Sequence, residues 1–307
     1  MKHHRIIHHY RLVLALLVVL LLAGCTSQGT EPDFTFVFMT DIHVQPERQA
    51  AQGYSQAIAR VNALQPDFII TGGDLIMDAL GQGYGRADSL YSLYNALTQE
   101  AEAPIYHTIG NHEVFGLYEG SGIDPSHPEY GKQMYLDRMG LDRTYYSFDR
   151  NGWHFIMLDG IGFTPERRYY GYVDSVQLDW LAMDLETVGK ETPIIVSTHI
   201  PFVSVVPQLT QGGQASASPG YLITNVHEVM AVLKDYNLKL VLQGHLHHVE
   251  DVYYDGIHFL TGGAVCARWW RGPNNGMPEG FMVLKVRGET IDWEYVSYDW
   301  VVPQEDQ

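Results

Sequence analysis

The sequence of 307 residues contains few cysteines and few basic residues. Two cysteines, Cys25 and Cys266, are too few for a disulfide framework. Only 19 lysines and arginines stand against 36 aspartates and glutamates, which gives a net charge of −17 at pH 7. Because such a surface repels phosphate backbones, we expect no binding to nucleic acid. The sequence also shows no repeat, no low-complexity tract and no convincing interdomain linker.

The N-terminal apolar run is too short to span a membrane. Residues 12–23 are all apolar, but 12 residues fall short of the roughly 20 that a spanning helix needs. Three basic residues and no acidic one precede this run, as in a secretory signal peptide. The ending Leu22-Ala23-Gly24-Cys25 resembles the bacterial lipobox, which implies cleavage before Cys25 and acylation of that cysteine. An ordinary secretory signal that is cut near Cys25 is the alternative.

This pattern leads to a prediction of domains and location. We expect a lipoprotein signal peptide over residues 1–24, a lipidated tether over 25–33 and one folded domain over 34–302. Several acyl chains on one residue give stable anchoring, so the protein is predicted to be a membrane-anchored lipoprotein of the cell envelope, on the periplasmic or surface side. Export implies an oxidising compartment, where Cys266 is expected as a buried or unpaired thiol.

The rest of the chain has a globular composition, with 46% apolar and 18% charged residues. Short β-rich segments alternate with helical periodicity around Tyr54–Leu64 and Leu90–Leu97, which favours an α/β architecture with a mixed or second sheet. The expected strands cover residues 34–39, 68–71, 105–109, 154–158, 194–198, 239–243, 258–260 and 281–286. Residues 116–150 are expected to form a long excursion over one face, and residues 205–219 a mobile loop.

Polar residues follow five of these strands directly. They are Asp41 and His43, then Asp74, then Asn111 and His112, then His199, and finally His245 and His247. The carboxyl edge of an α/β sheet is where such sheets bind ligands. Carboxylate, amide and imidazole donors suit zinc, iron or manganese. Too many candidates are present for one ion, so two divalent or trivalent ions that share a bridging carboxylate are predicted.

Five blocks of residues follow one another along the chain: Asp41-x-His43, Gly73-Asp74, Gly110-Asn111-His112-Glu113, His199 and Gly244-His245-x-His247. In their residues and their order, these blocks resemble the motifs of the calcineurin-like metallophosphoesterases. The resemblance implies a four-layer αββα sandwich of two mixed sheets. It also implies that Asp41, His43 and His247 bind one metal, that Asn111, His199 and His245 bind the other, and that Asp74 bridges them. His112 matches the family's histidine that contacts phosphate and assists the leaving group; Asp41 could instead orient His112.

Such a site would hydrolyse phosphate esters. Two cations about 3.5–4 Å apart clamp phosphoryl oxygens and favour attack by a metal-activated hydroxide, while an imidazole supplies the proton for the leaving oxygen. Met77 occupies the position where purple acid phosphatases carry a tyrosine, so no purple colour is expected. Leu75-Ile76-Met77-Asp78 also lacks the arginine-rich signature of the protein Ser/Thr phosphatases.

Some residues near these blocks have two interpretations. Trp269, Trp270 and Arg271 could line a substrate groove, with the guanidinium on an anionic group, or the tryptophans could pack against the second sheet. His248 could touch substrate or be a hydrogen-bonded surface histidine. Glu113 could support the site or cap a following helix.

The sequence leaves open both the type of phosphate ester that the protein hydrolyses and whether the protein is a phosphoesterase at all. The leading hypothesis is a phosphoesterase that acts on a phosphorylated small molecule or polymer fragment, as diester or monoester. The Gly-Gly-Asp-Leu and Gly-His-x-His-His patterns also resemble the cyclic-nucleotide phosphodiesterase branch. Alternatives are a catalytically silent metal-binding lipoprotein that serves as a binding or assembly module, and a dimetal hydrolase of non-phosphate esters.

Overall fold

The computed structural model describes residues 33–303. The predicted signal peptide, the lipidation site Cys25 and nearly all of the predicted tether lie outside these residues. No helix within residues 33–303 combines the length and apolar character needed to cross a membrane.

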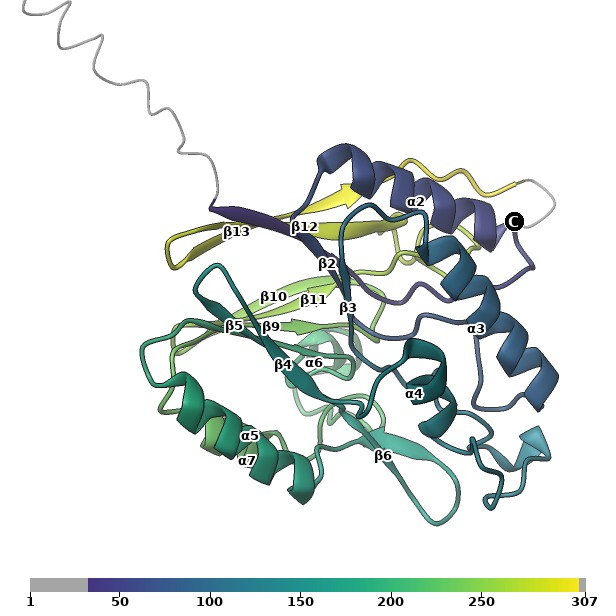
Figure 1. The fold of residues 1–307 in the computed structure, drawn as a ribbon, viewed down its shortest axis with the longest axis horizontal. Helices are drawn as coiled ribbons and strands as arrows, with labels where there is room; N and C mark the ends of the chain where they lie inside the picture. The colour runs from purple at the N-terminus through teal and green to yellow at the C-terminus, as the bar shows by residue number, and fades with distance from the viewer. Residues whose placement is uncertain (1–32, 304–307) are drawn as a thin grey trace, which may run out of the picture. The chain divides into compact units, whose positions relative to one another are not determined.

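Two mixed β-sheets form the centre of the described domain (Figure 1). The first sheet contains, in spatial order, β13 (Thr290–Ser297), β12 (Gly280–Arg287), β1 (Phe34–Met39), β2 (Phe68–Thr71) and β3 (Ile105–His107). The second contains β10 (Val249–Tyr254), β11 (Ile257–Gly262), β9 (Leu238–Gln243), β8 (Ile194–Thr198), β5 (Trp153–Met157) and β4 (Tyr146–Arg150). The strands β1, β2 and β3 run parallel, as do β11, β9, β8 and β5. The pairs β1–β12, β12–β13, β10–β11 and β4–β5 are antiparallel.

Alternation along β1 separates two layers of the core. Phe34, Phe36 and Phe38 belong to the cluster between the two sheets, where they meet apolar residues of β5, β8 and β9. Val37 and Met39 belong to the opposite cluster, beneath the helices. Side chains of a strand point to opposite faces in turn, and β1, which is apolar at five of its six positions, is buried on both sides.

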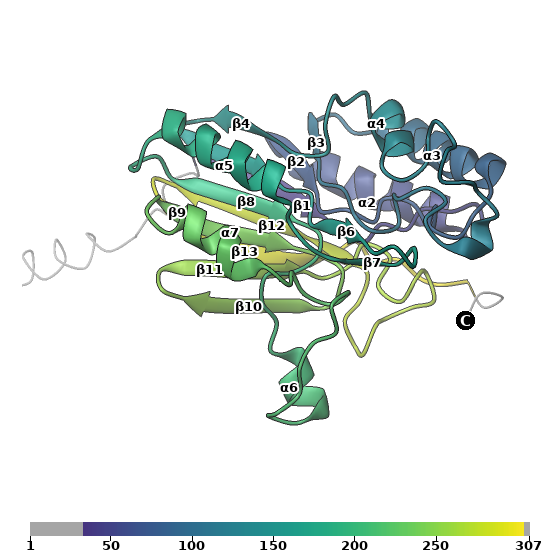
Figure 2. The same ribbon diagram turned by 90° about the horizontal axis from the view of Figure 1, so that it is seen from below.

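Helices cover the outer face of each sheet (Figures 1 and 2). The helices α2 (Ala50–Leu64) and α3 (Tyr84–Thr98) pack on the first sheet through residues such as Tyr54 and Leu90. The helices α5 (Ser175–Val188) and α7 (Val226–Leu233) pack on the second through residues such as Leu181 and Val229. The predicted four-layer αββα sandwich is confirmed.

The segments predicted as irregular contain regular structure. Within residues 116–150 lie the 3₁₀ helix η1 (Glu119–Ser121), the helix α4 (Gln133–Met139) and β4. The expected loop 205–219 includes the short helix α6 (Val206–Gln211). A further small sheet pairs β6 (Ile161–Phe163) with β7 (Tyr169–Gly171). These elements are short, and their stability depends on tertiary contacts rather than on local propensity.

Candidate metal centre

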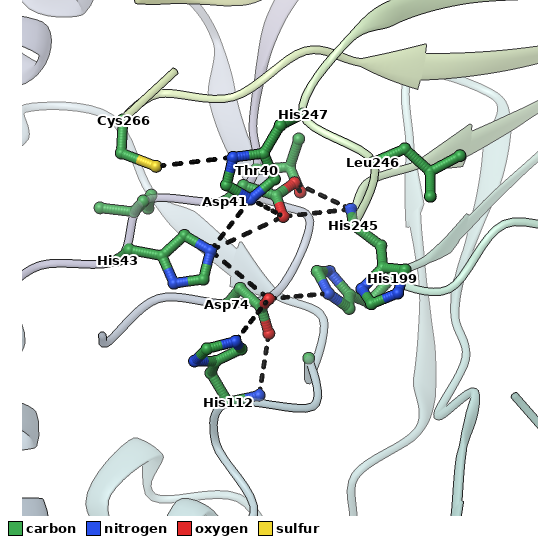
Figure 3. A network of polar contacts seen from close by, with 12 residues as sticks. Thr40, Asp41, His43, Asp74, His112, His199, His245, Leu246, His247 and Cys266 are labelled. Atoms are coloured by element: carbon green, nitrogen blue, oxygen red, sulfur yellow. Dashed lines mark hydrogen bonds and ion pairs between the residues drawn. The ribbon is translucent and has the colours of Figure 1, made fainter. Parts of the chain in front are cut away.

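The predicted ligands come from both sheets. Asp41 and His43 follow β1, Asp74 follows β2, Asn111 and His112 follow β3, His199 follows β8, and His245 and His247 follow β9. All five strands are parallel within their own sheets and end at the same edge. The structure gathers seven of the predicted side chains in one largely buried cluster (Figure 3): Asp41, His43, Asp74, His112, His199, His245 and His247. The buried Asn111 directly precedes His112.

Glycines allow the backbone to approach closely here. A Cβ atom on Gly110 would lie 2.2 Å from the amide nitrogen of Asp74, and one on Gly244 would lie 2.1 Å from Thr40 Oγ1. Both distances are far below van der Waals contact, so only glycine fits at these two positions. The loops that carry Asp74, Asn111 and His245 are held together in this way.

The Asp74 carboxylate lies at the centre of the cluster. Its Oδ2 atom is 3.1 Å from His199 Nε2, 3.5 Å from His43 Nε2 and 3.8 Å from His112 Nε2 (Figure 3). Together with His199 and His245, Asp74 forms one group of potential ligand atoms within 4.8 Å of one another, and with His43 and His112 it forms a second. A carboxylate shared by two neighbouring groups has the position that a bridging ligand requires.

Asp41, His43 and His247 meet on one side of Asp74. The Nε2 atoms of His43 and His247 are 3.2 Å apart, and His247 Nε2 is also 3.2 Å from Asp41 Oδ1. The other Asp41 oxygen accepts hydrogen bonds from Thr40 Oγ1 and from the backbone N–H of His245. The Asp41 carboxylate is therefore fixed in place, with one oxygen turned toward the two imidazoles.

Backbone carbonyls orient three of the histidines. His199 Nδ1 donates to Gly72 O at 2.7 Å, and His247 Nδ1 donates to Ala267 O at 2.6 Å. His112 Nδ1 donates to Met77 O. A carbonyl can only accept, so each Nδ1 carries the proton and each Nε2 is directed to the cluster. This arrangement is the one that metal-binding imidazoles use.

Two buried polar atoms of the cluster lack a hydrogen-bond partner among residues 33–303. They are Asn111 Oδ1 and His199 Nε2; the latter lies near Asp74 without hydrogen-bond geometry. Unpaired buried polar atoms are costly, and a cation is the partner that imidazole and amide oxygen atoms share. The donor set, with nitrogen and oxygen only, fits zinc, iron or manganese.

The carboxylates carry the charge that cations would neutralise. Burial alone would raise the pKa of Asp41, but His247 and His199 beside it lower that pKa to about 2. Burial likewise would raise the pKa of Asp74, and the imidazoles of His199 and His112 instead hold it well below its usual range. Both carboxylates are ionised at neutral pH.

The structure also answers two questions that the sequence left open. The polar contacts of His112 are with Met77 and Asp78 and with Asp74, and none is with Asp41, so the alternative in which Asp41 orients His112 is wrong. Glu113 caps no helix. Its buried carboxylate accepts backbone N–H bonds at about 2.8 to 3.3 Å from Asp74, Leu75, Ile76 and Gly110, and thereby ties the loops after β2 and β3 together.

The residues proposed to contact substrate lie in different places in the structure. Trp269 is 41% exposed, and its ring centroid lies 4.7 Å from that of His247, so it stands at the edge of the cluster. Trp270 is fully buried and donates its N–H to the carbonyls of Ile42 and His43; the prediction that Trp270 lines a groove is wrong, because its ring fills the core above Gly53. Arg271 lines a separate cavity that includes no residue of the cluster. His248 Nε2 lies 3.5 Å from Glu250 on the partly exposed side.

Two tyrosines near the cluster were not predicted from the sequence. The rings of Tyr169 and Tyr221 lie 6.1 and 6.5 Å from that of His245. Neither tyrosine is part of a motif, so no signal in the sequence could have placed them. Cys266 is a buried free thiol, as predicted, with Sγ 3.9 Å from His247 Nδ1.

Paired groups of carboxylate and imidazole ligands at the shared edge of a two-sheet sandwich define the class of dimetal phosphoric ester hydrolases. Residues 34–249 match the family model for calcineurin-like phosphoesterases, and the chain belongs to this family. It is a metal-dependent phosphoric ester hydrolase, and the family resemblance seen in the sequence is confirmed.

Curated relatives and solved structures agree with this family. A 3′,5′-cyclic-nucleotide phosphodiesterase of Nostoc sp. is 26% identical over 278 residues, which cover 85% of this chain and 91% of the relative. A cAMP/cGMP dual specificity phosphodiesterase of Mycobacterium tuberculosis is 24% identical, over 78% of this chain and 70% of the relative. A dimetal phosphatase from Danio rerio shares the fold with a TM-score of 0.62 at 17% identity, over 86% of this chain and 96% of the neighbour.

Proposed function

We propose that the protein is a phosphodiesterase with two metal ions bridged by Asp74. The observation that carries this proposal is the convergence of ligand atoms from both sheets on the Asp74 carboxylate. Asp41, His43 and His247 are assigned to one ion, and Asn111, His199 and His245 to the other. Manganese, iron and zinc all suit these donors.

When bound, such ions supply Lewis acidity toward phosphoryl oxygens and activate water for attack on phosphorus. Residues of the chain balance the charge of the ions, orient the ligands and supply a proton. Asp41 and Asp74 hold the charge that balances the cations, and the carbonyls of Gly72 and Ala267 keep His199 and His247 turned inward. His112 donates Nδ1–H to Met77 O and presents Nε2 to the cluster. As an imidazolium, protonated at both ring nitrogens, it can deliver the Nε2 proton to the departing oxygen and is left as the neutral imidazole.

Cyclic nucleotides are the substrate class that we propose. The names of the two curated relatives support it. The position of Trp269 also supports it, because an exposed indole next to His247 offers a surface for a nucleobase. Stacking of a base on an aromatic side chain contributes about 1–3 kcal/mol.

The test compares ester types on protein loaded with zinc, manganese or iron. We expect turnover of bis(4-nitrophenyl) phosphate and of 3′,5′-cyclic AMP, with 4-nitrophenyl phosphate and AMP cleaved much more slowly. Asp74→Asn, which keeps the size of the side chain, serves as the inactive control. Bound metal without turnover of any ester would contradict the proposal and favour a binding module; a preference for monoesters would replace it with a phosphatase.

The aromatic contact has its own test. Trp269→Ala should lower kcat/KM for cyclic AMP about tenfold or more, whereas Trp269→Phe should retain most of it. An equal loss for a diester without an aromatic group would show that Trp269 supports the cluster instead of a base.

We also propose that the domain acts outside the cytoplasm, on a lipid anchor at Cys25. The basic flank, the apolar run and the lipobox-like motif of the sequence support this. In a bacterial host that acylates lipoproteins, labelled palmitate should enter the wild-type chain and not the Cys25→Ser variant. A wild-type chain without label, recovered from the cytoplasm, would contradict the proposal.

A further inference from the structure

A tyrosine hydroxyl lies beside the metal cluster and has no hydrogen-bond partner there. The ring of Tyr169 meets the imidazole of His245 edge to face, with the centroids 6.1 Å apart and the ring planes at 89°. Tyr169 is half-buried, and its hydroxyl forms no hydrogen bond with another residue of the range 33–303. The hydroxyl is not one of the unpartnered atoms that are fully buried. It is therefore open to solvent, and a molecule that enters the site can reach it.

The ring of Tyr169 is packed against a turn of the backbone as well as against His245. A Cβ atom on Gly220 would lie 3.4 Å from Tyr169 Cε2, so this turn contacts the ring. The strand β7, which carries Tyr169, is joined to the same turn by a hydrogen bond of 2.8 Å from the N–H of Gly171 to Pro219 O. These contacts give the hydroxyl a defined position, which a hydrogen-bond donor in an active site requires.

The hairpin of β6 and β7 is anchored to the loop that follows His112. Arg167 donates to four backbone carbonyls within residues 116–123. The guanidinium of Arg168 lies 5.0 Å from the ring centroid of Tyr118, in the same loop. Tyr169 is the next residue of the hairpin, so its place relative to the loop after β3 is fixed by several contacts.

The electrostatic surroundings of Tyr169 agree with this position. Burial raises the pKa of Tyr169, and the negative charge of the Asp74 carboxylate raises it further. The phenol thus lies in the field of the central carboxylate and stays protonated as a donor at neutral pH. His245 is assigned to the second ion of the proposed centre, whereas Trp269 packs on His247 of the first. The hydroxyl and the indole therefore serve different sides of the site.

We propose that the Tyr169 hydroxyl donates a hydrogen bond to a non-bridging oxygen of the substrate's phosphoryl group. This oxygen gains negative charge during hydrolysis, and donors aimed at developing charge are among the largest contributions to catalysis. The inference rests on the proposed function, because it requires a phosphoryl group at the metal centre. Tyr169 is then a catalytic residue that belongs to none of the metal-ligand motifs.

Tyr169→Phe removes only the hydroxyl and tests the proposal directly. In the most active metal form, we expect kcat for bis(4-nitrophenyl) phosphate to fall about 10²-fold, with the metal content unchanged. Tyr170→Phe is the matched control, because Tyr170 is the next residue of β7 and its ring packs on Tyr172 on the other face of the strand. It should keep wild-type activity. A wild-type kcat in Tyr169→Phe, or loss of metal from that variant, would overturn the proposal.

The leaving group shows which oxygen the hydroxyl contacts. A donor to a non-bridging oxygen acts on every diester alike, so Tyr169→Phe should lose a similar factor in kcat with bis(4-nitrophenyl) phosphate and with diphenyl phosphate. The phenolate of diphenyl phosphate is the more basic leaving group and gains more from a proton donor. A much larger loss with diphenyl phosphate would mean that Tyr169 acts on the leaving oxygen, which contradicts the proposal.

A binding measurement separates this inference from the proposed function. Orthovanadate takes up the five-coordinate geometry of a phosphoryl transition state and needs no turnover. By calorimetry, it should bind metal-loaded Tyr169→Phe at least tenfold more weakly than the wild type or Tyr170→Phe. Equal affinity would overturn the inference even in an enzyme that hydrolyses diesters. Weaker binding in an enzyme that prefers monoesters would support the role of Tyr169 and contradict only the proposed function.

Discussion

Five of the predicted ligands have a left-handed backbone. Asp41, His43, Asp74, His245 and His247 have φ angles between 47° and 71°. Such conformations cost of order 1 kcal/mol or more for a residue with a side chain, and they gather at functional sites. Each of these residues lies in a loop that directly follows β1, β2 or β9. The cluster is thus built into the backbone and not only into the choice of side chains.

His112 gives the first prediction at the residue scale. Because its Nε2 faces the cluster and its Nδ1 is held by Met77 O, His112→Ala should lower kcat by about 10²–10⁴. Metal content should stay unchanged, since His112 is not assigned as a ligand. The measurement is steady-state hydrolysis of a diester together with metal analysis of the same sample.

His258 is a suitable control for this variant, because His258→Ala removes a partly exposed imidazole near the start of β11 that contacts Asp251 and Tyr253. If His112→Ala also loses metal, the histidine acts as a ligand and the proposed proton transfer is not its main role.

His154 gives a prediction about pH. Burial alone would lower its pKa, but hydrogen bonds to Asp184 and Asp149 outweigh burial and raise the pKa above 6.5. A raised pKa in the folded state stabilises the protein fully below about pH 6.5, and this contribution disappears as the pH rises through the folded-state value. The wild type should therefore exceed His154→Gln in unfolding free energy by a larger margin at pH 6 than at pH 9.

Chemical denaturation of both proteins across this pH range provides the measurement. A difference between wild type and His154→Gln that stays constant from pH 6 to 9 would mean that His154 does not change its charge there.

The identity of the cluster residues was predictable, but their surroundings were not. The residues within Asp41-x-His43, and likewise those within Gly110-Asn111-His112, are close neighbours in the chain, so their spacing alone identifies each motif. Trp270 was misassigned because a Trp-Trp-Arg sequence gives no sign that one indole fills the space above Gly53, more than 200 residues earlier, while its neighbour stays exposed.

At the scale of elements, Glu113 joins the loops that follow β2 and β3. It accepts four backbone N–H bonds, three of them from the residues that carry and follow Asp74. Burial, and then the nearby Asp74 carboxylate, raise the pKa of Glu113 to about 7. The carboxyl group acts as a shared cap for two turns that have no helix to stabilise them.

Glu113→Ala should leave these buried N–H groups unpaired. We expect a loss of about 3 kcal/mol in unfolding free energy and a 10–100-fold weaker metal affinity, because Asp74 loses its support. Glu113→Gln keeps one acceptor oxygen, so its unfolding free energy and its metal affinity should lie between those of the wild type and of Glu113→Ala. Wild-type metal affinity in Glu113→Ala would show that the turn after β2 is held by other contacts.

Long apolar segments were the easiest elements to predict. Residues 34–39 and 68–71 form strands as expected, because a run that is apolar at all but one position is typical of a strand buried on both faces. By contrast, β13 alternates exposed and half-buried residues, and α6 spans only six residues. Such elements depend on a partner that the local sequence does not specify.

At the scale of the whole domain, the metal centre joins the two sheets. Asp41, His43 and Asp74 come from the first sheet, and His199, His245 and His247 from the second. Ligands that bind only the folded state stabilise it by mass action. Bound metal should therefore hold the two sheets together at the edge where they are not joined by the phenylalanine core.

Removal of metal should lower the melting temperature. Metal at about 1,000 times its dissociation constant adds about 4 kcal/mol, which corresponds to a shift of about 10 °C for a domain of this size. Scanning calorimetry with and without a chelator checks this. In Asp74→Asn the chelator should have little effect, and an equal shift in that variant would place the stabilising metal elsewhere.

The first sheet has a further consequence for synthesis of the chain. Phe34 of β1 pairs with Val286 of β12, and β12 pairs in turn with β13. A nascent polypeptide leaves the ribosome with β1 ahead of the other described strands, so one edge of β1 has no partner until β12 has been synthesised. Premature termination anywhere before β12 would leave this edge open to association with other chains.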